Sequence, residues 1–337
     1  EMACIWLLPL LALGLPIAYL SIGLRGTLSS GLTIALMAWS LFALTPWLPL
    51  RGSRRWLTFG VFGLVSLPNL WILTFIYGIT LFYTVMWMLN RSIHSDSRLR
   101  DGFLLVRGMY APDEVAEIAR WTEEVANSPE VPGRDWKYFE TSQGDGSRIL
   151  CRIENFVPFH EGFAGLIQRR RMYQAVCELF GEEAVLFKDK INFKLPGGDG
   201  FRGHQDVQAG WDEFAGLHIT AMIAIDETNE ANGSLEMIPG MHREGVLGEM
   251  WAPLKDEDTR HAAYIPVHCK PGDAVFFDSF APHRSGPNRT DRARRVLYIT
   301  YNRLSEGDSR AQYYADKHKN YPPDIERDAG RDYRFKV

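Results

Sequence analysis

The first 90 or so residues are dominated by apolar stretches that contain no charged side chain. These uncharged stretches cover residues 3–24, 27–50 and 56–89. A helix needs about 20 apolar residues to cross a bilayer core of roughly 30 Å, so each stretch is long enough to span a membrane. The pattern therefore predicts an α-helical multi-pass membrane region with three or four membrane segments over residues 1–92, followed by a second domain over residues 93–337.

Arginines border these stretches unevenly. Three lie within residues 51–55 and three within residues 91–100, whereas Arg25 is the only basic residue between the first two stretches. Cytoplasmic loops of membrane proteins are enriched in Lys and Arg. Both clusters are therefore predicted to be cytoplasmic, which favours a hairpin within 56–89 over a single kinked span and places the second domain on the cytoplasmic face. No basic segment precedes the first stretch, which disfavours a cleavable signal peptide.

From residue 101 the chain alternates between helical and strand patterns. Residues 101–106 are an apolar strand candidate, Pro112 opens a helix, and a second helix is expected over about 162–180. Short β-type runs separated by Gly, Pro and Asn follow at 184–193, 217–225, 234–238, 264–268, 273–277 and 295–301. This order predicts an all-β-dominated domain, a double-stranded β-helix (a jelly roll like that of the cupins) with flanking α-helices.

Charge differs between the two parts of the chain. Residues 1–100 contain seven Arg, no Lys and two acidic residues, so the totals of 37 basic and 41 acidic residues leave 30 and 39 in residues 101–337. The resulting net charge of −9 argues against nucleic acid as a partner. The four cysteines form no C-x-x-C pair, which indicates neither a disulfide framework nor a zinc site.

Two histidines and an aspartate in the second domain form a candidate iron site. His204 and Asp206 follow a glycine-rich turn at 197–200, and His283 follows the strand candidate 273–277. Two imidazoles and one carboxylate can occupy one face of a six-coordinate iron and leave three positions open. A polar cluster or a zinc site is the alternative, but zinc prefers four tetrahedral ligands and the motif offers three.

These motifs resemble a known family. From about residue 101 to the C-terminus the chain is similar to the phytanoyl-CoA dioxygenase family of Fe(II)/2-oxoglutarate oxygenases. The shared features are the opening at 101–103, the His204-Gln205-Asp206 motif, residues 232–235 and 238–242, Gly272-Asp273, and His283 with Ser285, Pro287-Asn288 and Arg294. The family usually has Ser where Met241 stands, a structural position. Residues 190–198 are further similar to bacterial members, including the aminoethylphosphonate hydroxylases.

The resemblance implies roles for individual residues. His204, Asp206 and His283 are the implied Fe(II) ligands and catalytic residues. Arg294 is implied to bind the distal carboxylate of 2-oxoglutarate, since a guanidinium suits bidentate binding; O2 is the second cosubstrate and ascorbate a candidate reductant. Further cofactor-binding candidates are Thr220, Ser285, Lys190 and Asn192. Arg295 is the alternative to Arg294, but strand alternation places it on the other face. The intact Asp206 implies hydroxylation rather than halogenation.

Substrate candidates come from the strand before the iron motif and from tryptophan. Lys194 shares a strand face with Lys188, Lys190 and Asn192, and Arg202 follows nearby, so these residues are candidates to bind a phosphate, phosphonate or carboxylate. A solvated strand face is the alternative. Trp211 is a candidate pocket wall, and a cation cage with Trp251, Trp136 and Tyr138 competes with ordinary packing.

We therefore predict a membrane-anchored Fe(II)/2-oxoglutarate-dependent hydroxylase that oxidises an aliphatic C–H bond. The substrate candidates are a small molecule, a lipid, a lipid headgroup or a phosphonate-like compound, and the lipid bilayer is a predicted partner. The alternative is a regulatory domain that binds 2-oxoglutarate without turnover in a membrane sensor or transporter. A fusion of neighbouring reading frames is a third possibility, because the chain begins Glu1-Met2.

Overall fold

The computed structural model describes residues 100–169, 171–331 and 333. Its α-helices are α4 (Pro112–Asn127), α5 (Glu161–Arg169), α6 (Arg171–Phe180) and α7 (Arg310–Asn320). Its strands are β1 (Phe103–Val106), β2 (Trp136–Thr141), β3 (Arg148–Glu154), β4 (Ala184–Lys194), β5 (Phe201–His204), β6 (His218–Ala224), β7 (Leu235–Met237), β8 (Ile265–Val267), β9 (Ala274–Asp278), β10 (His283–Ser285) and β11 (Arg294–Arg303).

The predicted membrane region and the predicted domain boundary at 92/93 lie outside the described residues. Within the described part of the chain, no helix is long and apolar enough to cross a bilayer.

The strands form two antiparallel sheets. The larger has the order β1-β9-β6-β11-β4-β3-β2, and the smaller has the order β5-β10-β7-β8. An apolar cluster joins them, with Met222, Val275 and Val296 from the larger sheet and Leu235 and Met237 from the smaller. The predicted β-dominated, jelly-roll-like domain is confirmed.

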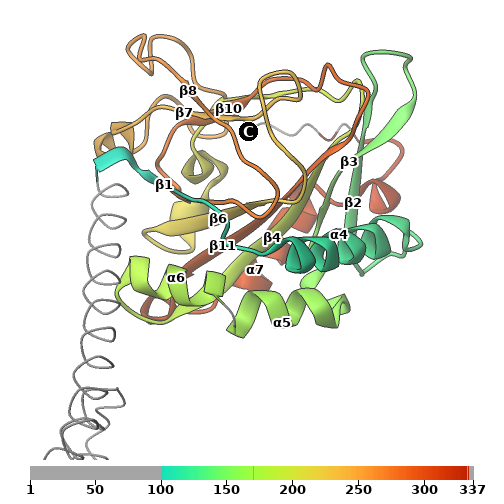
Figure 1. The fold of residues 1–337 in the computed structure, drawn as a ribbon, viewed down its shortest axis with the longest axis horizontal. Coiled ribbons are helices and arrows are strands. Elements are labelled where there is room, and N and C mark those ends of the chain that lie inside the picture. Colours follow the sequence, from blue (N-terminus) through green and yellow to red (C-terminus); the bar gives the residue numbers. More distant parts are fainter. Residues whose placement is uncertain (1–99, 170, 332, 334–337) are drawn as a thin grey trace, which may run out of the picture. The chain divides into compact units, whose positions relative to one another are not determined.

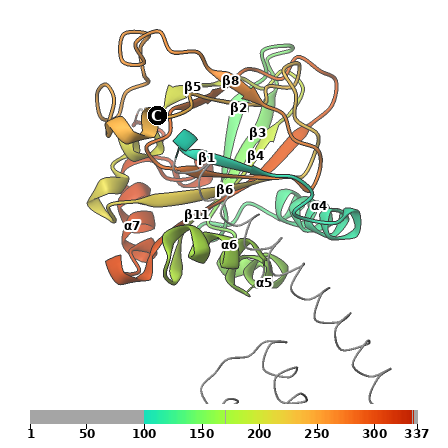
Figure 2. The same ribbon diagram turned by 60° about the vertical axis from the view of Figure 1, so that its left-hand side comes forward.

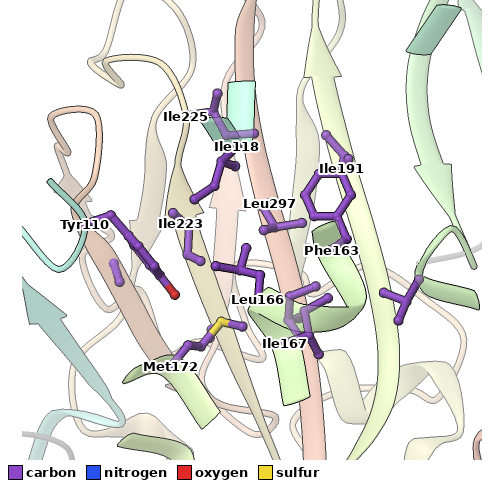
Figure 3. Packing of buried hydrophobic residues seen from close by; sticks show 14 of the residues in the cluster. Tyr110, Ile118, Phe163, Leu166, Ile167, Met172, Ile191, Ile223, Ile225 and Leu297 are labelled. Atoms are coloured by element: carbon purple, nitrogen blue, oxygen red, sulfur yellow. The ribbon is translucent and has the colours of Figure 1, made fainter. Parts of the chain in front are cut away.

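Helices α4, α5 and α6 cover the outer face of the larger sheet (Figures 1 and 2). Alternate residues of neighbouring strands supply this face, and they pack against apolar side chains of the helices. Figure 3 shows Ile191, Ile223 and Leu297 from the sheet among Phe163 and Leu166 from α5. Strand alternation leaves the opposite face of the same sheet for the space between the two sheets.

The inner face of the larger sheet is apolar at one end and charged at the other. On β4 the inward positions are Lys188, Lys190, Asn192 and Lys194, and β3 adds Arg152 and Glu154. All are buried except Lys190, which is half-buried. Burying charged groups is costly unless they find partners, so a sheet built this way indicates a binding site.

Most predicted strands agree with the structure. The six runs predicted from residue 184 onwards correspond to β4, β6, β7, β8, β9 and β11, and β1 and α4 also lie where they are expected. The helix expected over 162–180 is divided into α5 and α6. Four strands, β2, β3, β5 and β10, and helix α7 were not predicted.

Candidate metal centre and its cavity

The two histidines of the predicted iron site lie opposite each other on paired strands. His204 ends β5 and His283 begins β10, and the antiparallel register pairs them directly. Their ring centroids are 4.3 Å apart. Asp206 opens the short 3-10 helix η3 (Asp206–Ala209), with Oδ1 4.0 Å from Nε2 of His283. The potential ligand atoms of the three residues all lie within 4.8 Å of one another, close enough to share one ion.

Backbone carbonyls orient both imidazoles. Nδ1 of His204 lies 2.7 Å from the carbonyl oxygen of Arg202, and Nδ1 of His283 lies 3.0 Å from that of Ala281. A carbonyl can only accept, so each Nδ1 carries the proton and each Nε2 keeps a lone pair for a metal. Burial and the neighbouring His283 lower the pKa of His204 to about 3, which keeps this imidazole neutral.

The third member of the group is ionised. Burial alone would raise the pKa of Asp206, but His283 and Lys190 outweigh it and hold the pKa below its usual range. Thr220 donates to Oδ2 of Asp206 over 3.4 Å and lies 2.9 Å from the hydroxyl of Thr300. Two imidazoles and one carboxylate are the donor set that a non-haem Fe(II) site uses, so these residues fit that ion.

Two glutamines that the sequence analysis did not identify form hydrogen bonds that hold the turn around Asp206. Gln205 donates to the carbonyls of Gly245 and Phe280 and accepts from the amide of Leu247 at 2.7 Å. Gln208 accepts from the amide of Gln205 at 2.8 Å and donates to carbonyls at 247, 249 and 252. Both glutamines are fully buried. They join the turn around Asp206 to the loop 245–252. The sequence feature that could have predicted this role is a Gln at the middle of the His-x-Asp motif with a second Gln three positions later.

A cavity of about 630 Å³ contains the three candidate ligands. This volume lies in the range typical of small-molecule sites. Several predicted site residues line it as well: Lys190, Asn192, Thr220, Ser285 and Trp211. Trp251 also lines the cavity, whereas Trp136 and Tyr138 belong to a buried aromatic cluster with Trp211, which does not support a cage of all four.

Arg202, Lys194 and Arg294 are not among the residues that line this cavity. The side chain of Arg202 is exposed, which does not support its expected contact with substrate. A register shift in the β5–β10 pairing places Phe201 opposite Ser285 at this point. The contribution of Arg202 to the site is the carbonyl oxygen that orients His204.

Arg294 and Lys194 lie together behind Ser285. Arg294 donates to the carbonyl of Gly233 at 2.5 Å, and Lys194 donates to Ser285 Oγ at 2.8 Å. Burial and the nearby Arg294 lower the pKa of Lys194 to about 6. Among the described residues, no carboxylate lies within ion-pair distance of either cation. A buried guanidinium beside a lysine whose charged form is destabilised fits an anionic ligand such as the distal carboxylate of 2-oxoglutarate, which would stabilise the protonated Lys194, with Ser285 at the cavity surface.

Gly233 permits this arrangement because its backbone is left-handed, with φ +73°, and a Cβ there would meet the carbonyl oxygen of Gly286 at 2.1 Å. Arg295, the alternative to Arg294, is on the other strand face and forms an ion pair with Asp226 at 2.8 Å.

The rest of the cavity is cationic and aromatic. Lys188 lies 5.4 Å from the ring centre of Trp211, and Lys190 lies 4.7 Å from that of Tyr298. Burial and the neighbouring Lys188 lower the pKa of Lys190 to about 8. Asn192 Oδ1 is buried without a hydrogen-bond partner among the described residues. The cavity therefore offers ammonium donors with positive charge, and the amide of Asn192, next to the candidate metal ligands.

Comparison with known proteins decides the family. Residues 99–296 match the family model described as phytanoyl-CoA dioxygenase (PhyH). The chain belongs to this family. It is 44% identical over 236 residues to a 2-aminoethylphosphonate dioxygenase from uncultured bacterium HF130_AEPn_1, covering 69% of this chain and 89% of the relative. It is 37% identical over 232 residues to a methylphosphonate hydroxylase from Gimesia maris, covering 67% and 88%.

Solved structures of lower identity share the fold. EctD from S. alaskensis with 2-oxoglutarate and 5-hydroxyectoine has a TM-score of 0.54 at 22% identity, covering 63% of this chain and 76% of that one. The epimerase SnoN in complex with Fe3+, alpha ketoglutarate and nogalamycin RO has a TM-score of 0.55 at 19% identity, covering 74% and 96%.

The predicted family and enzyme class are confirmed. This PhyH-family protein is an oxidoreductase of the Fe(II)/2-oxoglutarate-dependent dioxygenase type, with iron as its metal and 2-oxoglutarate as its cosubstrate.

Proposed function

We propose that this enzyme hydroxylates a C–H bond of a small phosphonate. The observation that carries the proposal is the excess of positive charge in the cavity that also holds His204, Asp206 and His283. A phosphonate is a compact anion whose terminal oxygens accept several charge-assisted hydrogen bonds. Two relatives of high coverage are named for 2-aminoethylphosphonate and methylphosphonate, which supports the same substrate class here.

The metal ligands have the first role in the proposed reaction. His204, Asp206 and His283 would hold Fe(II) through two Nε2 atoms and one carboxylate, a ligand set that suits a metal that also binds a cosubstrate. The bound metal, with 2-oxoglutarate and O2, supplies the oxidising power for removing a substrate hydrogen. The carbonyls behind the histidines and Thr220 beside Asp206 keep the three donors fixed, which preserves the open face.

The cosubstrate is proposed to enter between the metal and Ser285. Its distal carboxylate would be bound by Arg294, Lys194 and Ser285, and its negative charge would stabilise the protonated form of Lys194. Lys190 and Asn192 line the same cavity as the three metal ligands and would supply further donors. Aromatic rings of the cavity wall, Trp211 among them, exclude water from the reacting C–H bond.

The alternative of a regulatory domain without turnover is not retained, because the family and the relatives named above are enzymes. Membrane anchoring through residues 1–92 and a cytoplasmic catalytic domain stay proposals from the sequence. A lipid headgroup is the competing substrate that anchoring suggests.

An assay of the full chain in detergent tests the proposal. The enzyme with Fe(II), 2-oxoglutarate and O2 is given 2-aminoethylphosphonate, methylphosphonate or a lipid extract, and succinate and oxidised product are measured by mass spectrometry. We expect succinate release to rise with a phosphonate and to be matched by a product heavier by one oxygen atom. Coupled turnover with the lipid extract alone would overturn the phosphonate assignment.

A further inference from the structure

Three basic side chains surround one buried carboxylate at the far side of the cavity from Arg294 and Lys194. Glu154 is fully buried. Its Oε1 lies 3.3 Å from Nε of Arg152 and 3.7 Å from Nζ of Lys188, and its Oε2 accepts from Nζ of Lys317. Burial alone would raise the pKa of Glu154, but Lys188, Lys317 and Arg152 hold the pKa well below its usual range, so the carboxylate is ionised.

One carboxylate cannot balance three cations, and no other carboxylate among the described cavity residues makes up the difference. The charged groups in the cavity interior are the cations Arg152, Lys188, Lys190 and Lys317 and the carboxylates Glu154 and Asp206. Other charged residues of the lining are paired or exposed: Arg284 with Glu236, Asp316 with Lys319, and Glu213. Basic side chains therefore outnumber carboxylates in the cavity interior by four to two, apart from Arg294 and Lys194, which are assigned to the cosubstrate. Uncompensated buried charge is costly, which indicates that a further anion belongs there.

Aromatic rings lie next to the three basic side chains. Arg152 lies 4.4 Å from the ring centre of Tyr138, and Lys188 and Lys317 lie 5.6 and 5.9 Å from that of Tyr313. Rings of this kind hold cationic groups in place while leaving their N–H donors available. Burial lowers the pKa of Lys317, and the neighbouring Lys188 and Arg152 lower it further, whereas Glu154 raises it. A bound anion would therefore stabilise the protonated lysine.

Three separate elements bring these cations together. Arg152 is on β3, Lys188 is on β4, and Lys317 is on α7, which lies beyond the family-matched residues 99–296. The family match alone therefore does not assign this cluster. Other residues of the same helix and its end also line the cavity: Tyr313, Asp316, Asn320 and Tyr321.

The cluster lies within reach of a small substrate held at the metal. Thr220, which contacts Asp206, pairs in register with Thr300, and Thr300 pairs with Lys188. Two strand spacings separate Thr220 from Lys188, about 10 Å between backbones. Lysine and arginine side chains reach inward from there, so a molecule of a few atoms can contact the cations and present a carbon to the metal.

We infer that Arg152, Lys188 and Lys317 form the binding site for the phosphonate group of the substrate, with Glu154 holding the three cations in position. This inference rests on the proposed function. Three basic side chains that converge on one position match the three terminal oxygens and the double charge of a phosphonate better than a singly charged carboxylate or phosphodiester. A lipid headgroup phosphate is a diester, with one negative charge and two terminal oxygens, and is expected to bind more weakly.

The test compares Lys317→Gln with Lys319→Gln, a matched change on the same helix. The side chain of Lys319 is 72% exposed and pairs with Asp316. Calorimetry without O2 measures binding of methylphosphonate and glycerophosphoethanolamine to the full chain loaded with Fe(II) and 2-oxoglutarate. We expect Lys317→Gln to weaken methylphosphonate binding at least tenfold, since a charge-assisted hydrogen bond is lost, and Lys319→Gln to leave it unchanged.

Two further readouts separate this site from a folding defect and from the reaction itself. Affinity for 2-oxoglutarate should be unchanged in Lys317→Gln, and Lys317→Arg should restore most of the phosphonate affinity. Methylphosphonate binding that is insensitive to Lys317, or tighter binding of glycerophosphoethanolamine, would overturn the inference. Binding that depends on Lys317 without any hydroxylation would support the phosphonate site and contradict the proposed reaction. Hydroxylation of the phosphonate that does not depend on Lys317 would support the reaction and contradict the site.

Discussion

At the scale of single residues, the site depends on hydrogen bonds made away from the cavity. The carbonyls of Arg202 and Ala281 fix the tautomers of His204 and His283, and so leave Nε2 of each ring for the metal. A backbone carbonyl also orients Arg294, whose guanidinium is buried behind Ser285 and donates to the carbonyl of Gly233. These contacts are made to backbone atoms, so the identity of the neighbouring side chains does not reveal them.

Arg294 gives a prediction at this scale. Arg294→Ala should raise the KM for 2-oxoglutarate by at least tenfold, because a desolvated carboxylate would lose a charged, bidentate partner. Arg295→Ala is the matched control, since Arg295 pairs with Asp226 on the other strand face, and its KM should stay close to wild type. Steady-state succinate formation measures both. An unchanged KM in Arg294→Ala, together with a raised KM in Lys194→Ala, would move the role to Lys194.

Sequence patterns predicted the metal-site residues better than the substrate-site residues. His204, Asp206 and His283 form a motif whose residue types follow from metal chemistry. Arg152, Glu154 and Lys317 form none, because β3 and α7 bring them together only after folding. The lysines of β4 were recognised as one strand face, but a solvated face and a buried anion site have the same alternating pattern.

At the scale of elements, the missed strands share a physical cause. β3 buries Arg152 and Glu154 on its inner face, and β2 buries Lys137 on its outer face, where Nζ donates to the carbonyl of Ala126, so neither strand shows simple apolar alternation. β5 and β10 are only four and three residues long. Helix α7 is strongly polar and buries Tyr313 and Tyr314 rather than an aliphatic stripe. Strands that build an inner site therefore gave the weakest signal.

The start of β6 gives a pH prediction. His218 is buried against Phe187 and Trp211, with ring centroids 4.3 and 5.4 Å away, and burial lowers its pKa to about 4. The unfolded chain binds this proton below about pH 6.5. Between about pH 6.5 and pH 4 the unfolded state therefore holds more protons, and stability falls as the pH falls, by about 3 kcal/mol from this group.

His218→Phe should remove that contribution and flatten the decrease in the free energy of unfolding between pH 7 and pH 4. Chemical unfolding followed by tryptophan fluorescence at several pH values measures it. The exposed His268→Phe serves as the control and should retain the wild-type decrease. An equal decrease in His218→Phe and wild type would show that His218 is not neutral in the folded protein.

At the scale of the whole molecule, the two sheets enclose a site with three chemically distinct parts, two of which line the cavity while the third lies behind Ser285. The paired strands β5 and β10 carry the candidate metal ligands, the ends of β4 and β11 carry Lys194 and Arg294, and β3 with α7 carries the cations around Glu154. The antiparallel jelly-roll-like fold was predictable from the order of strand patterns. Which cations face the cavity was not, because that depends on long-range pairing.

The measurement that tests the central claim most directly is an anaerobic titration of the full chain with Fe(II) and 2-oxoglutarate. The visible charge-transfer band of a metal-chelated keto acid reports whether the site forms. We expect a saturable band in the wild type that is lost in His204→Ala, with the fold of the variant checked by circular dichroism. Absence of the band in folded wild-type protein, or its persistence in folded His204→Ala, would contradict the metal site described above.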